Sequence, residues 1–276
     1  GLSRPQEGRL HCGACSAGFD RRGAVWGFAG DFRPPGFPLT RHAGLQAIEE
    51  GHFWFEARDR LLARWLQRRT KPGPEVTVLD IGCGTGRFLS LAGALGYGTV
   101  GVDGHAEPLE LASARCPSAT LVHGDIAHVP FADDQFDVVV ALDVLEHVET
   151  GPVLREVARV VRPHGGLLVS VPALPWLWSR MDELAGHRLR YTVPRLRESL
   201  TGGGWVLRSW THYQCLVLPL VAISRLLARR AEQPLERRPP AWLNHLLARV
   251  NHLEVRLLGG LRLPWGSSLI AWGTPS

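Results

Sequence analysis

Four aspartates between residues 76 and 148 each end or follow an apolar, β-branched run that is typical of a buried strand. These acids are Asp80, Asp103, Asp125 and Asp143. Carboxylates accept hydrogen bonds from hydroxyl groups and attract cationic groups. The carboxyl ends of parallel strands meet at one edge of a sheet, where α/β proteins bind their ligands. The four acids therefore predict one ligand site at that edge.

Three alternate glycines, Gly82, Gly84 and Gly86, follow the first of these strands and precede an apolar pattern of helical spacing. Glycine permits tight backbone turns and lets a ligand approach main-chain atoms closely. A strand, a glycine-rich turn and a helix N-terminus together predict a nucleotide-binding crevice. The spacing is not the G-x-G-x-x-G of dinucleotide-binding proteins, which disfavours an NAD-dependent oxidoreductase.

Strand and helix patterns alternate through most of the chain. Strands are predicted at residues 76–81, 98–103, 119–126, 136–142, 166–171, 205–210 and 268–272, and helices at 108–115, 153–161 and 193–200. Such alternation implies right-handed crossovers and a mainly parallel sheet covered on both faces. We expect an α/β fold with a doubly wound, mainly parallel seven-stranded sheet, whose last two strands close it as an antiparallel pair.

About fifty residues separate the sixth and seventh predicted strands, and they contain two apolar helical patterns. We expect this helical insertion to pack over the cleft or to form a dimer contact; a surface that lies on a membrane, through residues 214–260, is the alternative. The predicted domains are an N-terminal segment and linker (1–40), a helical cap (41–75), the core (76–213 plus 266–276) and the insertion (214–265).

The motifs of residues 76–171 resemble the class I S-adenosylmethionine-dependent methyltransferases, in the broad group of methyltransferase domains 11 and 23. They are Val78-Leu79-Asp80-Ile81-Gly82-Cys83-Gly84-Thr85-Gly86, Val100-Gly101-Val102-Asp103, Gly124-Asp125-Ile126, Phe136-Asp137-Val138-Val139, Leu145-Glu146-His147 and Val161-Arg162-Pro163-His164-Gly165-Gly166. The resemblance implies S-adenosyl-L-methionine as the cofactor.

The same resemblance assigns parts of the cofactor to residues of this chain. Asp80 and the glycine turn, with Gly82, Cys83, Gly84 and Gly86, would hold the methionine part. Asp103, with Gly104 after it, would bind the ribose hydroxyls, and Asp125 with Ile126 the adenine. Leu142 and Asp143 would line the reacting end. The segment ahead of this domain is dense in aromatic side chains, and we expect His52, Trp54 and Arg58 to cap the cofactor pocket; a role as core or lid is the alternative.

Residues 172–192 leave the fifth predicted strand at the ligand-binding edge and are rich in Trp, Asp, His, Arg and Tyr. His187 is the first candidate for a general base and His147 the second, because histidine titrates near neutrality. Arg188 and Arg190 could hold an acidic acceptor. Trp176 and Tyr191 complete the predicted substrate-binding set. Alternatively, these side chains only pin the loop to the sheet.

A single C-x-x-C pair, Cys12 and Cys15, resembles the second half of a zinc ribbon. A closed zinc site needs four ligands, and only His11 stands beside the pair, so we predict a degenerate half ribbon and no metal. Five cysteines in a chain of 276 residues favour a reducing compartment, and we expect the cytoplasm.

The sequence therefore predicts a methyltransferase that acts on a small-molecule acceptor, by O-methylation in a biosynthetic pathway. The net charge of +5 is too small to imply a nucleic-acid partner. An RNA methyltransferase is one alternative, and a non-catalytic subunit that binds S-adenosylmethionine and stabilises a partner is another. The oligomeric state is left open, with a dimer as one option.

Overall fold

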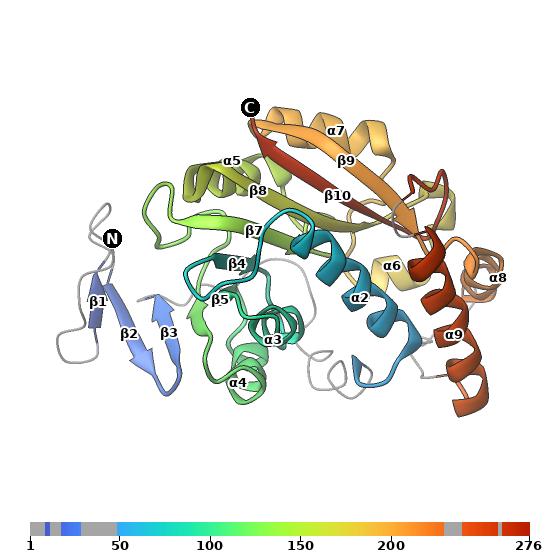
Figure 1. The fold of residues 1–276 in the computed structure, drawn as a ribbon, viewed down its shortest axis with the longest axis horizontal. Coiled ribbons are helices and arrows are strands. Elements are labelled where there is room, and N and C mark those ends of the chain that lie inside the picture. The colour runs from blue at the N-terminus through green and yellow to red at the C-terminus, as the bar shows by residue number, and fades with distance from the viewer. Residues whose placement is uncertain (1–8, 12–17, 29–48, 229–238, 259–260) are drawn as a thin grey trace.

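The computed structural model describes residues 9–11, 18–28, 49–228, 239–258 and 261–276 (Figure 1). Its strands are β1 (Arg9–His11), β2 (Gly18–Arg22), β3 (Val25–Phe28), β4 (Thr77–Ile81), β5 (Gly98–Asp103), β6 (Thr120–His123), β7 (Phe136–Leu142), β8 (Val161–Pro172), β9 (Trp205–Tyr213) and β10 (Ser268–Pro275). Its helices are α2 (Phe53–Gln67), α3 (Arg87–Ala94), α4 (Ala106–Arg115), α5 (Thr150–Val160), the 3₁₀ turn η2 (Pro175–Leu177), α6 (Arg180–Leu184), α7 (Val193–Gly202), α8 (Leu218–Ala228) and α9 (Ala241–Leu258).

The strands form one mixed sheet in the order β1-β2-β3-β6-β5-β4-β7-β8-β10-β9. The strands from β3 to β8 in this order pair in parallel, and β10 pairs antiparallel with both β8 and β9. The order reverses between β4 and β7, so a crevice is expected outside the carboxyl ends of these two strands.

The central strand β7 is apolar because both of its faces are covered. Val139 and Ala141 pack in the cluster to which α5 and α7 contribute, whereas Val138 and Val140 pack in the cluster to which α2 and α3 contribute. This alternation is the two-residue period of a strand buried between two helical layers. Figure 1 shows α5 and α7 on one side of the sheet and α2 and α3 on the other.

The predicted number of seven strands was wrong: the described residues form a sheet of ten. The seven predicted strands correspond to β4–β10, and the other three come from residues 9–28. Val25 and Trp26 of β3 pair in parallel with β6, and Phe19 of β2 is buried in the core. The added strands cover the edge of β6, which would otherwise present unpaired backbone groups.

The half zinc ribbon stays a prediction, because Cys12 and Cys15 lie outside the described residues. The strands on either side of them, β1 and β2, pair with each other.

Two helices, α8 and α9, lie in the chain between β9 and β10. Helix α9 packs along α2, and α8 packs against α6 and η2. Within the part of the chain that the structure describes, none of the helices combines the length and apolar character needed to cross a bilayer.

Candidate functional site

A cavity of about 1430 Å³ lies at the carboxyl ends of β4, β5, β6 and β7, and α2, α8 and α9 also contribute to its wall. Most of the residues predicted from the sequence line it. They are His52, Trp54, Arg58, Asp80, Gly82, Cys83, Gly84, Asp103, Gly104, Asp125, Ile126, Leu142, Asp143, His147, His187, Arg188 and Arg190. The crevice predicted at the reversal of strand order is therefore present.

The glycine turn needs glycine for two separate reasons. Gly82, Gly84 and Gly86 all have positive φ angles, of 70°, 51° and 75°, which side chains disfavour. In addition, a Cβ on Gly82 would lie 2.6 Å from Cγ2 of Val144. Gly86 does not itself line the cavity but ends the turn at the N-cap of α3.

Two buried polar atoms, one acceptor and one donor, belong to residues that line the cavity. Oδ1 of Asp80, an acceptor, and Nε of Arg58, a donor, are both buried and have no hydrogen-bond partner among the described residues. Burial raises the pKa of Asp80 well above its usual value, against the opposing effect of Arg58. Buried groups of this kind are normally satisfied. An α-amino acid zwitterion offers an ammonium for the first and a carboxylate for the second.

Asp103 is held rigidly at the end of β5. Its two carboxylate oxygens accept hydrogen bonds from the backbone N–H of Gly84, at 2.8 Å, and of His105, at 2.9 Å. A carboxylate has about four acceptor positions, so both oxygens can still accept from a diol. At the end of the next strand, Oδ1 of Asp125 accepts from the backbone N–H of Ala127, which leaves Ile126 at the cavity wall.

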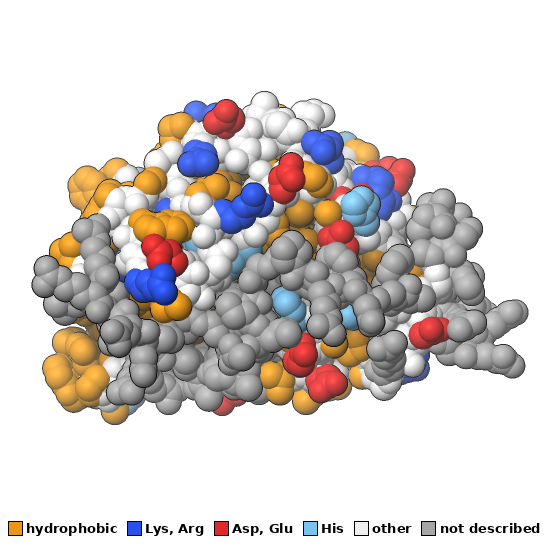
Figure 2. All heavy atoms as spheres, turned by 180° about the vertical axis from the view of Figure 1, so that it is seen from behind, with side chains coloured by type: hydrophobic (Ala, Val, Ile, Leu, Met, Phe, Trp, Pro, Cys, Tyr) orange, Lys and Arg blue, Asp and Glu red, His pale blue; other side chains and the backbone are white. Residues whose placement is uncertain are grey.

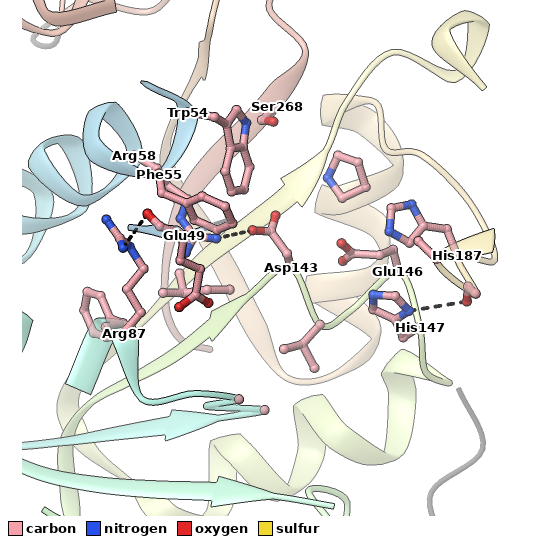
Figure 3. Close-up of a pocket in the computed structure, with 18 of the residues that line it drawn as sticks. Glu49, Trp54, Phe55, Arg58, Arg87, Asp143, Glu146, His147, His187 and Ser268 are labelled. Carbon is pink, nitrogen blue, oxygen red and sulfur yellow. Dashed lines mark hydrogen bonds and ion pairs between the residues drawn. The ribbon is translucent and has the colours of Figure 1, made fainter. Parts of the chain in front are cut away.

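Arg58 joins helix α2 to the residue that follows β7 (Figure 3). Its NH1 donates to Oδ2 of Asp143 at 2.5 Å, and its guanidinium lies 4.7 Å from the ring centroid of Trp54. Asp143 has a positive φ of 56° directly after β7, and its Oδ1 accepts from the Ser170 hydroxyl. His52 caps α2 by accepting from the N–H of Trp54. The cap and the strand end are thus one polar unit.

Glu49 was not expected from the sequence. It is 5% exposed, accepts hydrogen bonds from the Thr85 hydroxyl in the glycine turn, and pairs with Arg115 of α4 at 2.7 Å. Its position ahead of α2, far from both partners in the chain, gave no pattern that could have indicated this contact.

Asp182 organises the loop after β8 and was also missed. It is fully buried, and it accepts hydrogen bonds from Nδ1 of His187, Nε of Arg190 and NH1 of Arg225, at 2.9–3.1 Å. Burial alone would raise its pKa, but these three partners lower it to about 2. The capping box with Ser179 at the start of α6 was a sequence signal that could have found it.

A second polar group lies at the far side of Asp143 and consists of Glu146, His147 and His187 (Figure 3). The two imidazole rings are 4.8 Å apart, edge to face. Burial, together with the nearby His187, lowers the pKa of His147 to about 4. Glu146 is 1% exposed, and burial raises its pKa well above the usual value.

Trp176 and Tyr191, predicted to bind substrate, are not among the described residues that line the cavity. Tyr191 is 1% exposed and donates its hydroxyl to the carbonyl of Leu145, which fixes the loop to the chain after β7. Trp176 is 57% exposed at the surface of η2. Arg190 does line the cavity, but it also pairs with Asp182, whereas Arg188 is exposed at the cavity wall.

Comparison with known proteins identifies the domain that carries this cavity. Residues 79–169, from within β4 to within β8, match the family model described as "Methyltransferase domain". These residues are therefore similar to methyltransferase domains. The match agrees with the fold, since the matched residues span the strands whose carboxyl ends form the cavity.

Two relatives that match the chain are named as methyltransferases. A protein of Mycolicibacterium smegmatis named a probable S-adenosylmethionine-dependent methyltransferase is 31% identical over 140 residues, which are 50% of this chain and 53% of the relative. A ubiquinone biosynthesis O-methyltransferase of Azorhizobium caulinodans is 32% identical over 161 residues, covering 56% of this chain and 60% of the relative. The chain thus spans about half to three fifths of the length of these relatives.

Solved structures agree on the fold. The geranyl diphosphate C-methyltransferase of Streptomyces coelicolor, solved with Mg²⁺, geranyl diphosphate and S-adenosyl-L-homocysteine, superposes with a TM-score of 0.54 over 78% of each chain, at 12% identity. Together, the family match and these relatives show that the core of the chain is similar to methyltransferases, and S-adenosylmethionine is the cofactor that the name of the Mycolicibacterium relative gives. The unpartnered atoms of Asp80 and Arg58 fit the ammonium and carboxylate of this cofactor.

Proposed function

We propose that this protein transfers the methyl group of S-adenosylmethionine to a hydroxyl group of a small, largely apolar molecule. The observation that carries the proposal is the division of the cavity by Asp143. In Figure 3, Arg58 and Glu49, which accepts a hydrogen bond from Thr85 of the glycine turn, lie on one side of Asp143, and Glu146 with His147 and His187 lies on the other. Asp80 of β4 and Asp103 of β5 line the same cavity. The first half suits the cofactor and the second suits a group that must lose a proton.

The part of the cavity wall that comes from the helical insertion supports an apolar acceptor. It includes aliphatic side chains of the helical insertion, namely Leu220, Val221, Leu243 and Leu247. Apolar walls with a few placed polar groups are typical of sites for small molecules. Arg188, at the same wall, could orient an acidic substituent of the acceptor.

The chain's own residues have three tasks in this reaction. When bound, the cofactor supplies a methyl carbon already activated by a sulfonium. In this proposal Asp80, Arg58 and Asp103 fix the two ends of the cofactor, so that its methyl group faces the region beyond Asp143. The insertion excludes water, and Glu146, His147 and His187 receive the acceptor hydroxyl and take part in its deprotonation. Holding the two reactants in line is itself worth a large part of the rate acceleration.

The name of the Azorhizobium relative supports oxygen as the attacked atom and a biosynthetic role, since that protein is an O-methyltransferase of ubiquinone biosynthesis. Amine and RNA acceptors are the competing outcomes of the test. Methyl transfer is assayed with the purified chain, by formation of S-adenosylhomocysteine, against apolar phenols and alcohols, matched amines, and tRNA. Turnover of the amines or tRNA alone would contradict the proposal.

With an acceptor in hand, His187→Ala is expected to lower kcat/KM by roughly 100-fold or more, the usual contribution of a placed proton-transfer group. The affinity of His187→Ala for S-adenosylhomocysteine should stay within about twofold of the wild-type value, because the substitution does not change the proposed cofactor half. His164→Ala, at an exposed position of β8, is the matched control and should behave as wild type. Unchanged turnover in His187→Ala would remove this residue from the proposed chemistry.

A further inference from the structure

Two imidazoles and one carboxylate converge at the acceptor end of the cavity. Glu146 and His147 follow β7, whereas His187 comes from the loop after β8. One possible ligand atom from each lies within 4.8 Å of the other two. All three line the cavity, and Figure 3 shows them grouped beside Asp143. The fold therefore brings together three metal-ligand side chains from two distant segments.

The carboxylate of Glu146 needs a partner that none of the described residues provides. Both of its oxygens are buried without a hydrogen-bond partner, and the residue is only 1% exposed. Burying a polar group without a partner is costly, and a buried carboxylate more so. Buried charges in native proteins are normally paired or coordinate a metal. Because Glu146 lines the cavity, its missing partner can come from a ligand there.

Each imidazole is already oriented through its Nδ1. Nδ1 of His187 lies 3.0 Å from Oδ1 of Asp182, and Nδ1 of His147 lies 3.3 Å from the carbonyl oxygen of Gly186. A carbonyl can only accept, so His147 carries its proton on Nδ1. A carboxylate favours the same tautomer in His187, which places the lone pair of each ring on Nε2. Metal-binding histidines commonly have such a carboxylate or carbonyl behind them.

We propose that Glu146, His147 and His187 bind one divalent transition-metal cation, such as Mn²⁺ or Zn²⁺. Two imidazole nitrogens and one carboxylate oxygen suit these ions better than Mg²⁺ or Ca²⁺, and three protein ligands leave coordination positions open. This proposal departs from the sequence prediction, which expected no metal.

A cation at this position would promote deprotonation of the acceptor hydroxyl in the proposed methyl transfer. This role rests on the proposed function. The acceptor hydroxyl coordinates the cation, which lowers the hydroxyl pKa, and its proton leaves to solvent. The oxygen then attacks the methyl carbon, an O–C bond forms, and the C–S bond breaks with its electron pair going to sulfur. The cation is neither oxidised nor reduced.

Binding is tested with Mn²⁺ alone, by electron paramagnetic resonance of the free ion, and by thermal unfolding with and without Mn²⁺ and Zn²⁺. Wild type should bind one equivalent and unfold at a higher temperature with the ion present. Glu146→Gln and His187→Gln should each weaken binding by at least about tenfold, since even the loss of a supporting residue has an effect of that size. His164→Gln, which removes an exposed histidine outside the cluster, should bind as wild type.

Equal Mn²⁺ affinity in Glu146→Gln and wild type, or no binding of either ion to wild type, would overturn the site. Glu146→Gln is nearly isosteric and removes an unpartnered carboxylate, so the metal-free variant should unfold no earlier than wild type, which keeps the comparison valid. If the ion binds but chelation leaves methyl transfer unchanged, its role in the reaction is overturned. If the ion binds and no acceptor is methylated, the proposed function fails instead.

The helical insertion carries a second, independent set of observations. Large apolar side chains that are exposed in the described part of the chain occur almost entirely between residues 216 and 265, and the remaining one, Trp176, lies on η2 beside α8. They are Leu216, Leu220, Ile223, Leu226, Trp242, Leu246, Leu253, Leu261 and Trp265. In Figure 2, apolar side chains gather at the edge of the molecule on which these helices lie. An apolar surface of this extent marks an interaction site.

The charge of the chain is concentrated in the same segment. Residues 214–265 contain eight arginines and three glutamates, a net charge of +5, which equals the net charge of the whole chain. The remaining 224 residues carry 23 basic and 23 acidic side chains. Apolar residues together with excess arginine are the combination by which helices bind anionic lipid surfaces.

We infer that the face formed by α8, α9 and residues 261–265 docks on an anionic lipid bilayer. The opposite faces of these helices are occupied, since α9 packs on α2 and α8 on α6. Leu220 and Leu243, from the two helices, line the cavity. An apolar acceptor dissolved in the bilayer could therefore enter the cavity between α8 and α9.

Co-sedimentation with vesicles tests this inference. The chain should bind vesicles of phosphatidylcholine mixed with phosphatidylglycerol, and bind them less at high salt or when phosphatidylcholine is the only lipid. Arg249→Gln with Arg256→Gln, both exposed on α9, should weaken binding roughly 30-fold, at about 1 kcal/mol for each arginine. The matched control is Arg195→Gln with Arg197→Gln on α7, which makes the same charge change elsewhere and should have little effect.

An equal loss of vesicle binding in the two double variants would show an unspecific charge effect and overturn the inference. Failure to bind anionic vesicles would do the same. If, in addition, analytical ultracentrifugation shows a dimer that Leu246→Ser with Leu253→Ser converts to a monomer, the face is a contact between two copies of this chain.

Discussion

Asp103→Asn is expected to weaken binding of S-adenosylhomocysteine, the demethylated cofactor, by roughly 100-fold, or about 2.7 kcal/mol. In the proposed site both ribose hydroxyls donate to this carboxylate, and hydrogen bonds to a charged acceptor are among the stronger ones. The substitution has a second cost. Both oxygens already accept from backbone N–H groups, of Gly84 and His105, so the new amide NH₂ would face one of those donors.

Isothermal titration calorimetry measures this affinity directly and needs no acceptor. Asp133→Asn is the matched control, because Asp133 is exposed, pairs with Arg159 and is absent from the cavity wall. The affinity of this variant for S-adenosylhomocysteine should stay within about twofold of wild type. Binding of Asp103→Asn at wild-type strength, with an unchanged unfolding temperature, would show that the ribose does not lie at the end of β5.

The sequence predicted the parts of the site that follow from local patterns. Asp80, Asp103 and Asp125 end or follow apolar strands, and parallel strands bring their carboxyl ends to one edge whatever the rest of the chain does. The positions of these acids at the cavity wall therefore agree with an inference that needed only strand boundaries. The glycine turn is similar, since its three positive φ angles are a local property of the backbone.

Other features depend on contacts between distant segments, and sequence patterns do not encode them. Glu49 meets Thr85 and Arg115, and Arg58 meets Asp143, only after α2 has packed beside the glycine turn. The pairing of β3 with β6 is likewise non-local, so residues 25–28 were not recognised as part of the sheet. Tyr191 was expected at the substrate because of its type, yet burial decides its position.

Two residues in the proposed acceptor half of the cavity also show what sequence patterns leave out. Glu146 belongs to a motif that the resemblance identified, but its sequence neighbours do not reveal that its carboxylate is buried without a partner. His187 was predicted from its type, and only the fold shows Asp182 behind its ring. Asp182 positions His187 rather than contacting a ligand, and its capping box with Ser179 was the signal that marked it in the sequence.

Asp182→Ala is expected to be the most destabilising single substitution in the loop after β8, with a loss of about 3–5 kcal/mol in the free energy of unfolding. Asp182 is fully buried, and its removal leaves Arg190, itself 4% exposed, and the partly buried Arg225 without their carboxylate. Breaking a buried pair on one side is costly because the remaining charge stays desolvated. For a protein of this size the loss corresponds to a fall of roughly 10 °C in Tm.

The neighbouring residue provides the control for this substitution. Glu183 pairs with Arg180 at the surface, with both side chains about half exposed, and such pairs contribute about 0–1 kcal/mol. Denaturant unfolding of Glu183→Ala should therefore resemble wild type. The free energy of unfolding of Asp182→Asn should fall between those of Asp182→Ala and Glu183→Ala, because the amide oxygen of the new side chain can still accept from one partner. Since Arg225 belongs to α8, Asp182→Ala should also loosen this helix and increase proteolysis within it. Equal stability of Asp182→Ala and Glu183→Ala would mean that the loop is held by Tyr191 and its backbone contacts instead.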